Sequence, residues 1–253
     1  MPLHTLIAPE QQRAILQSLL AIYEKEGWLP DAWVAGDFGS IQGGTNVDVV
    51  FADAVAKDLG GFDQEQALKA LRHHAEHPSD NPKKQGRYLE DYLKLGYVTS
   101  SSAKGATSRS LEYAYNDFCI AKVAEAAGDT ATARKYRKRS QGVFKLFNKE
   151  AGHFWAKDQS GNWQPDITTE NLRKDHWNDP YFYEATPLPT AAMYPTICGG
   201  LSNGTEARKF ISNTWIVCCW TPGLTSVMNC SSCCPISTFM RVGRIKPLKP
   251  FSI

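Results

Sequence analysis

The sequence lacks the features of several large classes of protein. It has no run of about 18 apolar residues, and its start is not a basic segment followed by an apolar one, so we expect neither a transmembrane helix nor a signal peptide. A formal net charge of +2 over 253 residues gives no reason to expect a nucleic-acid or membrane-surface partner. The Gly-x-Ser-x-Gly, Walker and Cys/His nucleophile patterns are also missing.

Cysteine is scarce over most of the chain. Cys119 and Cys198 are the only two before position 218, and the other five lie between positions 218 and 234. The spacing Cys230-x-x-Cys233-Cys234 allows a zinc interpretation. A zinc site also needs an ordered second shell, however, and a disulfide cluster would need an oxidising compartment. We therefore predict no metal ligands among these residues.

Acidic residues are missing from the end of the sequence. Residues 207–253 contain no Asp or Glu but six Lys or Arg, and helical periodicity stops there. Such a segment does not extend a packed helical domain easily. We therefore expect one domain over residues 1–212 and a disordered Cys-, Ser- and Pro-rich tail over residues 213–253.

Helical periodicity dominates what is present, and the alternation typical of strands is sparse. Asp63 is a plausible N-cap for one of the helices. The simplest architecture is an all-α array of helical hairpins, joined by loops that carry glycine and tryptophan. The predicted helices are residues 9–26, 46–58, 63–77, 88–95, 107–127, 129–147 and 189–198.

The segment from Asp179 to Leu188 surrounds one carboxylic acid with aromatic side chains. Tyr181, Phe182 and Tyr183 directly precede Glu184. Aromatic rings stack on pyranose sugars, and apolar surroundings raise the pKa of a carboxylic acid so that it can donate a proton near neutral pH. This combination suits a sugar-cleaving site, although a partly buried hinge has the same composition.

Two other segments allow both a structural and a functional interpretation. The segment from Gly43 to Ala54 starts a helix at a glycine pair, which is typical either of a capped, buried helix or of a ligand loop at a helix N-terminus. In the segment from Ser108 to Phe118, Arg109 and Glu112 could form a buried network that joins helices or could contact a substrate.

Three histidines, His73, His74 and His77, lie on one predicted helix. No carboxylate has the spacing that would complete a zincin motif. We therefore interpret all three as surface residues.

Taken in order, these segments resemble the fungal branch of the glycoside hydrolase family 92 α-mannosidases. The resemblance runs from about residue 2 to residue 212, and the order and spacing of its motifs are more specific than any single motif. The matching pieces are Pro2–Pro9, Gly27-Trp28-Leu29-Pro30, Gly43-Gly44-Thr45-Asn46 through Asp53-Ala54, Ser108–Ala121, Tyr136-x-x-Arg139-Ser140 and Phe182-Tyr183-Glu184.

The resemblance implies a fold and a reaction. The family combines an N-terminal β-sandwich with an (α/α)6 toroid, and its members remove terminal α-linked mannose with inversion, aided by calcium. By position in the motif, Glu184 is the catalytic acid. Bacterial members usually follow this acid with Gly-Asn, whereas this chain has Ala185-Thr186.

Candidate residues for ring stacking on the sugar are Trp28, Trp33, Tyr181 and Tyr183. Asp53, Arg109 and Glu112 are expected to support the scaffold. The expected substrate is a mannose-terminated N-glycan or mannan. Members of the family are often secreted, and the sequence leaves the compartment open between secretion and the cytosol.

The resemblance also identifies missing parts. The sequence contains no segment for the β-sandwich, so we expect only a partial toroid. An aspartate cluster that would supply the catalytic base does not follow Glu184. We therefore expect this chain to be inactive as it stands. The alternative from another class is a non-catalytic carbohydrate-binding or scaffold fragment.

A shifted reading frame would explain the tail. Codons permitted for residues 227–243, read from their third base, allow a sequence that resembles the family's Asn-Glu motif, which helps to bind calcium and sugar. We therefore expect a frame shift after about residue 212 and the loss of the calcium ligands from this chain.

Overall fold

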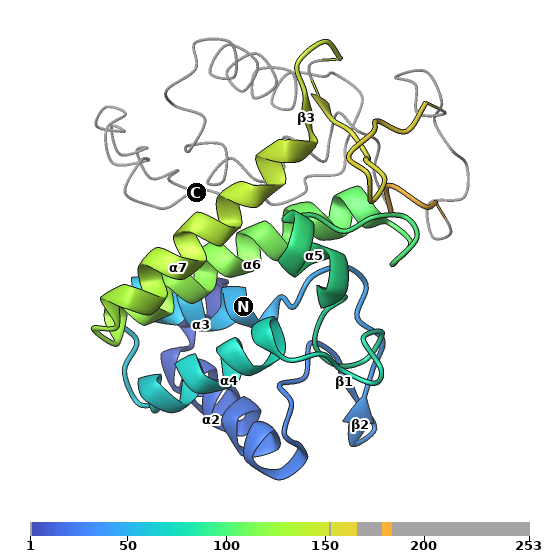
Figure 1. Ribbon diagram of the computed structural model, residues 1–253. Helices are drawn as coiled ribbons and strands as arrows, with labels where there is room; N and C mark the ends of the chain where they lie inside the picture. Colours follow the sequence, from blue (N-terminus) through green and yellow to red (C-terminus); the bar gives the residue numbers. More distant parts are fainter. Residues whose placement is uncertain (1, 152, 166–178, 184–253) are drawn as a thin grey trace, which may run out of the picture.

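The computed structural model describes residues 2–151, 153–165 and 179–183, which are coloured in Figure 1. This part of the chain consists mainly of helices joined by loops, which confirms the all-α prediction. The helices are α1 (Pro2–Ile7), α2 (Pro9–Glu26), α3 (Val47–Ala56), α4 (Gln64–Glu76), α5 (Leu89–Leu95), α6 (Ala106–Ala126), α7 (Thr130–Ser140) and the 3-10 helix η1 (Gln141–Leu146). The strands are β1 (Trp33–Val34), β2 (Asp37–Phe38), β3 (Phe147–Asn148) and β4 (His153–Phe154).

Helix α6 is the central element. Helices α3, α4, α7 and η1 all contact it, and α7 runs back alongside it after the turn at Gly128 (Figure 1). Most of the side chains of α6 are buried, which is typical of a helix enclosed by neighbours rather than lying at a surface. The main apolar core joins α6 to α2, α3, α4 and α7 through residues such as Leu16, Phe51, Leu71, Ile120 and Tyr136.

Several helix ends follow the local sequence signals. Asp63 accepts a hydrogen bond from the backbone N–H of Gln66 at 2.9 Å, which confirms it as the N-cap of α4. Asp129 caps α7 in the same way through the N–H of Thr132, also at 2.9 Å. Helix α2 begins at Pro9, as predicted.

Other boundaries differ from the prediction. The single helix predicted over residues 129–147 is divided into α7 and η1. Within η1, Gly142 lies so close to the backbone of Gly96 that a Cβ on Gly142 would be 3.0 Å from the Gly96 oxygen. This close approach favours a change of helix geometry at that point. Helix α1 and the two hairpins were not predicted, because elements of two to six residues are too short for periodicity to reveal.

No helix in the described ranges is both long enough and apolar enough to cross a membrane.

Candidate functional site

The aromatic segment 179–183 is fixed to the N-terminal end of α6 (orange and green in Figure 1). The first N–H groups of a helix have no partner inside the helix and must find acceptors elsewhere. Here the carbonyl groups of the aromatic segment are the acceptors. The bonds are Gly105 N–H to Asp179 O at 2.9 Å, Ala106 N–H to Pro180 O at 3.0 Å and Thr107 N–H to Tyr181 O at 2.8 Å.

Asp179 stabilises the fold of this segment. Its carboxylate accepts hydrogen bonds from the backbone N–H groups of Tyr181, at 2.7 Å, and Phe182, at 2.9 Å. This Asx-type turn, together with the bonds to α6, places Tyr183 over the start of that helix. The backbone N–H of Tyr183 donates to the Ser108 hydroxyl on α6 at 3.3 Å.

Tyr183, Glu112 and Gly43 meet at one point. A Cβ built on Gly43 would lie 1.7 Å from the Tyr183 hydroxyl oxygen and 2.5 Å from both carboxyl oxygens of Glu112. A larger residue at this position would therefore displace the ends of the Tyr183 and Glu112 side chains. Gly44 is equally restricted, because a Cβ there would lie 2.4 Å from Asn116 Oδ1 and 2.7 Å from Glu112 Oε2.

The loop before α3 is held against α6 by side chains that accept its backbone N–H groups. Thus the N–H groups that a ligand loop would offer to an anion are already used inside the protein, which favours the structural interpretation of the Gly43-Gly44 segment. The bonds are Gly44 N–H to Glu112, Thr45 N–H to Asn116 Oδ1 at 2.9 Å and Val47 N–H to Asp31 Oδ1 at 3.2 Å.

Two carboxyl groups in this cluster hold their protons unusually tightly. Burial, with a smaller contribution from the nearby charge of Asp31, raises the pKa of Glu112 to about 7 against the opposing effects of the Gly44 N–H and Arg109. Burial also raises the pKa of Asp31 to about 6. Carboxylic acids that titrate near neutral pH are suited to donating hydrogen bonds or protons. The sequence left two roles open for Glu112, a buried scaffold network or contact with a substrate, and favoured the scaffold.

Arg109 forms part of a network that joins α6 to the glycine loop, which is one of the two roles that the sequence left open for Arg109 and Glu112. Its guanidinium donates to the backbone oxygens of Gly43, at 2.9 Å, and Lys104, also at 2.9 Å, and stacks 5.2 Å from the ring centre of Tyr88. Arg109 therefore joins α6 to the glycine loop through carbonyl groups, and it acts on Glu112 through its charge.

A buried ionic network lies behind the site. Arg87 is 1% exposed and donates to Asp48 and Asp117, each at 2.7 Å, and to the Thr45 hydroxyl at 3.0 Å. Asp117 also accepts two hydrogen bonds from Arg139, both at 2.6 Å. These charges compensate each other inside the core. They fix α3, α6 and α7 around the glycine loop.

The interpretation of His74 as a surface residue is wrong. The side chain is 1% exposed, and its Nε2 lies 2.7 Å from Asp48 Oδ1. His74 follows Ala67, Ala70 and Leu71 at helical spacing, so it lies on the buried face of α4. That spacing was visible in the sequence. His73 and His77 are half-buried and exposed, respectively.

The predicted ring-stacking residues lie in different surroundings. Trp28 packs edge-on against His73, with ring centres 4.6 Å apart. Trp33 is 40% exposed on the β1–β2 hairpin and packs edge-on against Phe38 at 5.1 Å. Neither of these ring contacts involves the Tyr183 cluster.

The two tyrosines also differ from each other. Tyr181 is 8% exposed and packs with Phe182 and Ala156, while its hydroxyl donates to Gln164 Oε1 at 3.3 Å. Tyr183 alone among the four candidates contacts the Gly43–Glu112 cluster. Glu184, the predicted acid, lies outside the described residues.

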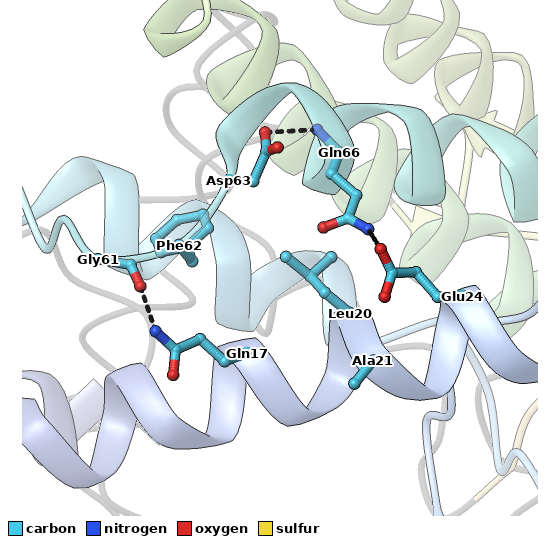
Figure 2. Close-up of a pocket in the computed structure, with 8 residues that line it drawn as sticks. All are labelled: Gln17, Leu20, Ala21, Glu24, Gly61, Phe62, Asp63 and Gln66. Atoms are coloured by element: carbon cyan, nitrogen blue, oxygen red, sulfur yellow. Dashed lines mark hydrogen bonds between the residues drawn. The ribbon is translucent and has the colours of Figure 1, made fainter.

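A groove of about 460 Å³ lies between α2 and α4 (Figure 2). Hydrogen bonds join its two walls, from Gln17 to the Gly61 oxygen at 2.7 Å and from Gln66 to Glu24. None of the predicted site residues lines this groove, and its polar groups bond to each other. It therefore belongs to the packing of α2 against α4.

In residues 2–151, 153–165 and 179–183, no group of three or more His, Cys, Asp or Glu is arranged to hold a metal ion.

Comparison with known proteins identifies the relatives of this chain. A sequence model for the glycosyl hydrolase family 92 catalytic domain matches residues 1–213. A protein of Arthroderma benhamiae described as an uncharacterized secreted glycosidase is 32% identical over 146 residues, which is 54% of this chain and 19% of that protein.

Solved structures show the same fold. An inverting mannosidase of family GH92 from Bacteroides thetaiotaomicron is 31% identical, with a TM-score of 0.69 over 81% of this chain and 28% of that protein. A GH92 α-mannosidase from the same organism, solved with mannoimidazole, is 25% identical, with a TM-score of 0.69 over 84% of this chain and 28% of that protein. The chain thus spans less than a third of the length of these relatives.

Proposed function

The chain belongs to glycosyl hydrolase family 92. On that premise we propose that its function is that of an exo-α-mannosidase, which removes terminal α-linked mannose from N-glycans or mannans with inversion. The observation that carries this proposal is the match to a solved inverting mannosidase at 31% identity over most of this chain. The docked aromatic segment supports it, because it holds the residue before Glu184 at a cluster of carboxyl groups that titrate near neutral pH.

Glu184 is proposed as the general acid. It follows Tyr183, whose ring lies against Gly105 and whose hydroxyl lies beside Gly43. A general acid must keep its proton near neutral pH, and a nearby negative charge favours the protonated form. Glu112, once ionised, would supply such a charge. Tyr183 and the exposed ring of Trp33 are proposed to contact the sugar.

Inversion needs a second carboxylate, about 6.5–9.5 Å from the acid, that activates a water molecule. The aspartate cluster expected for that role is not found after Glu184 in this sequence. We therefore expect the 253-residue chain alone to release little mannose. A positioned base contributes roughly 10²–10⁴-fold to the rate.

The test compares the chain with its Glu184→Gln variant in mannose release from an α-mannosyl aryl glycoside with added calcium. Release that disappears in the variant supports the assignment of Glu184. Equal release from both proteins contradicts it.

If neither protein releases mannose, mannose binding measured by calorimetry shows whether the chain is a carbohydrate-binding fragment or has no sugar-directed role. Binding without turnover supports the alternative, a carbohydrate-binding fragment. Absence of both activities contradicts a sugar-directed role for this chain.

Calcium is part of the proposal. Oxygen ligands can hold a hard cation against sugar hydroxyl groups, and we propose that the enzyme uses calcium in this way but that the calcium ligands are missing from this chain. The melting temperature of the chain, measured with calcium and then with excess chelator, tests this point. We expect identical values, and a rise in melting temperature with calcium would mean that the chain still holds the ligands.

We also propose that the domain ends at about residue 212 and that the tail arises from a shifted reading frame. Sequencing the transcript across codon 212 tests this idea directly. An open frame that encodes the printed tail, with no shifted alternative, would exclude it.

A further inference from the structure

Trp163 is a large aromatic side chain that is open to solvent. It is 39% exposed, and it lies just after the turn that follows β4. A single exposed apolar side chain is common on protein surfaces and needs no explanation by itself. Trp163 is distinguished by its surroundings, which combine a fixed backbone, a neighbouring cation and a direct link to the aromatic segment 179–183.

The backbone around Trp163 is fixed by a tight turn. Lys157 and Trp163 pair in an antiparallel bridge. Within the turn, the N–H of Asp158 donates to the backbone oxygen of Asn162 at 3.0 Å, and the Asp158 carboxylate accepts the Asn162 N–H at 2.8 Å. The indole ring is therefore presented from a fixed point, so less conformational entropy is lost when a ligand stacks on it.

The same turn is joined to the aromatic segment (yellow and orange in Figure 1). The Tyr181 hydroxyl donates to Gln164 Oε1 at 3.3 Å, and Ala156 packs with the Tyr181 side chain. Gln164 directly follows Trp163 in the chain, and Tyr181 lies shortly before Glu184. Trp163 and the proposed general acid therefore belong to segments that are bonded to each other.

Lys157 supplies a positive charge beside the ring. Its ammonium nitrogen lies 4.0 Å from the centre of the Trp163 ring. A contact of this kind is weak where it is exposed to water, so an arriving ligand can displace it. The displaced ammonium group can then donate hydrogen bonds to the ligand. An aromatic ring with such a donor beside it suits a pyranose sugar, which has both apolar faces and hydroxyl groups.

The side of the substrate that Trp163 could contact follows from the exo mode of action. An exo-acting glycosidase binds only the terminal sugar unit before the bond that it cleaves. Any further sugar unit that contacts the protein therefore lies on the leaving-group side of that bond. Binding energy from such a remote unit can be used to position the substrate at the reacting atoms.

We propose that Trp163 stacks on the sugar unit next to the terminal mannose, and that Lys157 donates a hydrogen bond to the same unit. The substrate class is then an α-linked oligosaccharide rather than a simple mannoside. This inference rests on the proposed function, because it takes the terminal mannose to be bound beside Glu184. In this role Trp163 determines specificity and takes no part in proton transfer.

The experiment is calorimetric titration of the full chain with methyl α-mannoside and with an S-linked α-mannobiose, whose thioglycosidic bond resists cleavage. We expect the mannobiose to bind the wild type more tightly. Trp163→Ala should weaken mannobiose binding about tenfold and leave binding of methyl α-mannoside unchanged, whereas Trp163→Phe should retain most of the affinity. Leu93→Ala is the matched control, since Leu93 is also an exposed apolar side chain, and it should bind both sugars as the wild type does.

The outcomes separate this inference from the proposed function. If the wild type binds methyl α-mannoside, but Trp163→Ala binds the mannobiose as tightly as the wild type does, the inference is overturned and the proposed function stands. If the wild type binds neither sugar, a sugar-directed function is contradicted and the inference is overturned with it.

Nuclear magnetic resonance provides a second measurement that does not depend on how Trp163→Ala folds. In the wild type with isotope-labelled tryptophan, the indole N–H signal that disappears in Trp163→Phe belongs to Trp163. We expect the mannobiose to shift this signal and methyl α-mannoside to leave it unchanged. A signal that the mannobiose does not move overturns the inference.

Discussion

The backbone N–H of Gly44 donates a hydrogen bond to the carboxylate of Glu112, which lies 68 positions later in the chain. This bond links the loop before α3 to the buried face of α6, and Tyr183 closes over the same point. Three segments distant in sequence thus share one small volume. Changes at this point should therefore affect both stability and the placement of the aromatic segment.

The first prediction concerns the pH dependence of stability. Folding raises the pKa of Glu112 from 4.5 to about 7, so the fold favours its protonated form. Stability linked to this group is complete below about pH 4.5 and is lost as the pH rises through about 7. In the Glu112→Gln variant, the free energy of unfolding should fall less between pH 5 and pH 8, by about 2 kcal/mol.

Urea denaturation at the two pH values measures this difference. Glu90→Gln is the matched control, because the Glu90 side chain is 78% exposed on α5, and it should behave as the wild type. The prediction fails if Glu112→Gln loses as much stability as the wild type over this range.

The second prediction concerns Gly43. A methyl group there would overlap the Tyr183 hydroxyl, so Gly43→Ala should destabilise the protein by about 1–3 kcal/mol through overpacking. Gly60→Ala is the control, since nothing lies within 4 Å of a Cβ at that glycine. Thermal unfolding of both variants tests the difference.

A double-mutant cycle identifies the group responsible. Tyr183→Phe removes the hydroxyl that the new methyl group would meet, so Gly43→Ala should cost about 1 kcal/mol less in that background. Additive effects of the two substitutions would mean that Tyr183 does not occupy this position in solution.

The third prediction concerns the buried ionic network. Arg87→Met leaves Asp48 and Asp117 with one cation fewer in the core, and breaking a buried pair typically costs about 3–5 kcal/mol. Chemical denaturation should therefore show a large loss of stability. Arg134→Met, on the exposed face of α7, should change stability by less than about 0.5 kcal/mol. Similar losses in the two variants would refute a special role for Arg87.

The fourth prediction concerns the N-terminal cap of α7. Asp129→Ala removes the side-chain acceptor for the Thr132 N–H and should cost about 1 kcal/mol. Asp129→Asn retains an acceptor at the N-cap and should preserve most of the stability. Melting temperatures of the two variants provide the comparison, and equal losses would argue against capping.

The sequence allowed the long helices to be located because apolar spacing is a local property. Asp63 and Pro9 mark helix starts through interactions within one turn, so their roles could be predicted from the sequence alone. Arg87 could not be understood in this way. It lies in a loop, and its partners Asp48 and Asp117 are 39 and 30 positions away.

The candidate site, too, could be predicted only where the signal is local in the sequence. The motif around Tyr183 was identified from its composition, whereas its contact with Gly43 depends on how the whole domain packs. Glu112 was assigned to the scaffold because no local pattern reveals that a carboxyl group will be buried beside Asp31. Burial and long-range contacts, rather than residue type, decide which acids acquire unusual pKa values.

The capping of α6 by residues 179–181 has a consequence for protein synthesis. Helices α1 to α7 are complete once residue 140 has left the ribosome, but the acceptors for the first N–H groups of α6 emerge about 40 residues later. At roughly 5–20 residues per second, that delay lasts a few seconds. Throughout it, the nascent domain exposes an unsatisfied helix end and an open space beside Gly43, both of which are available for wrong contacts.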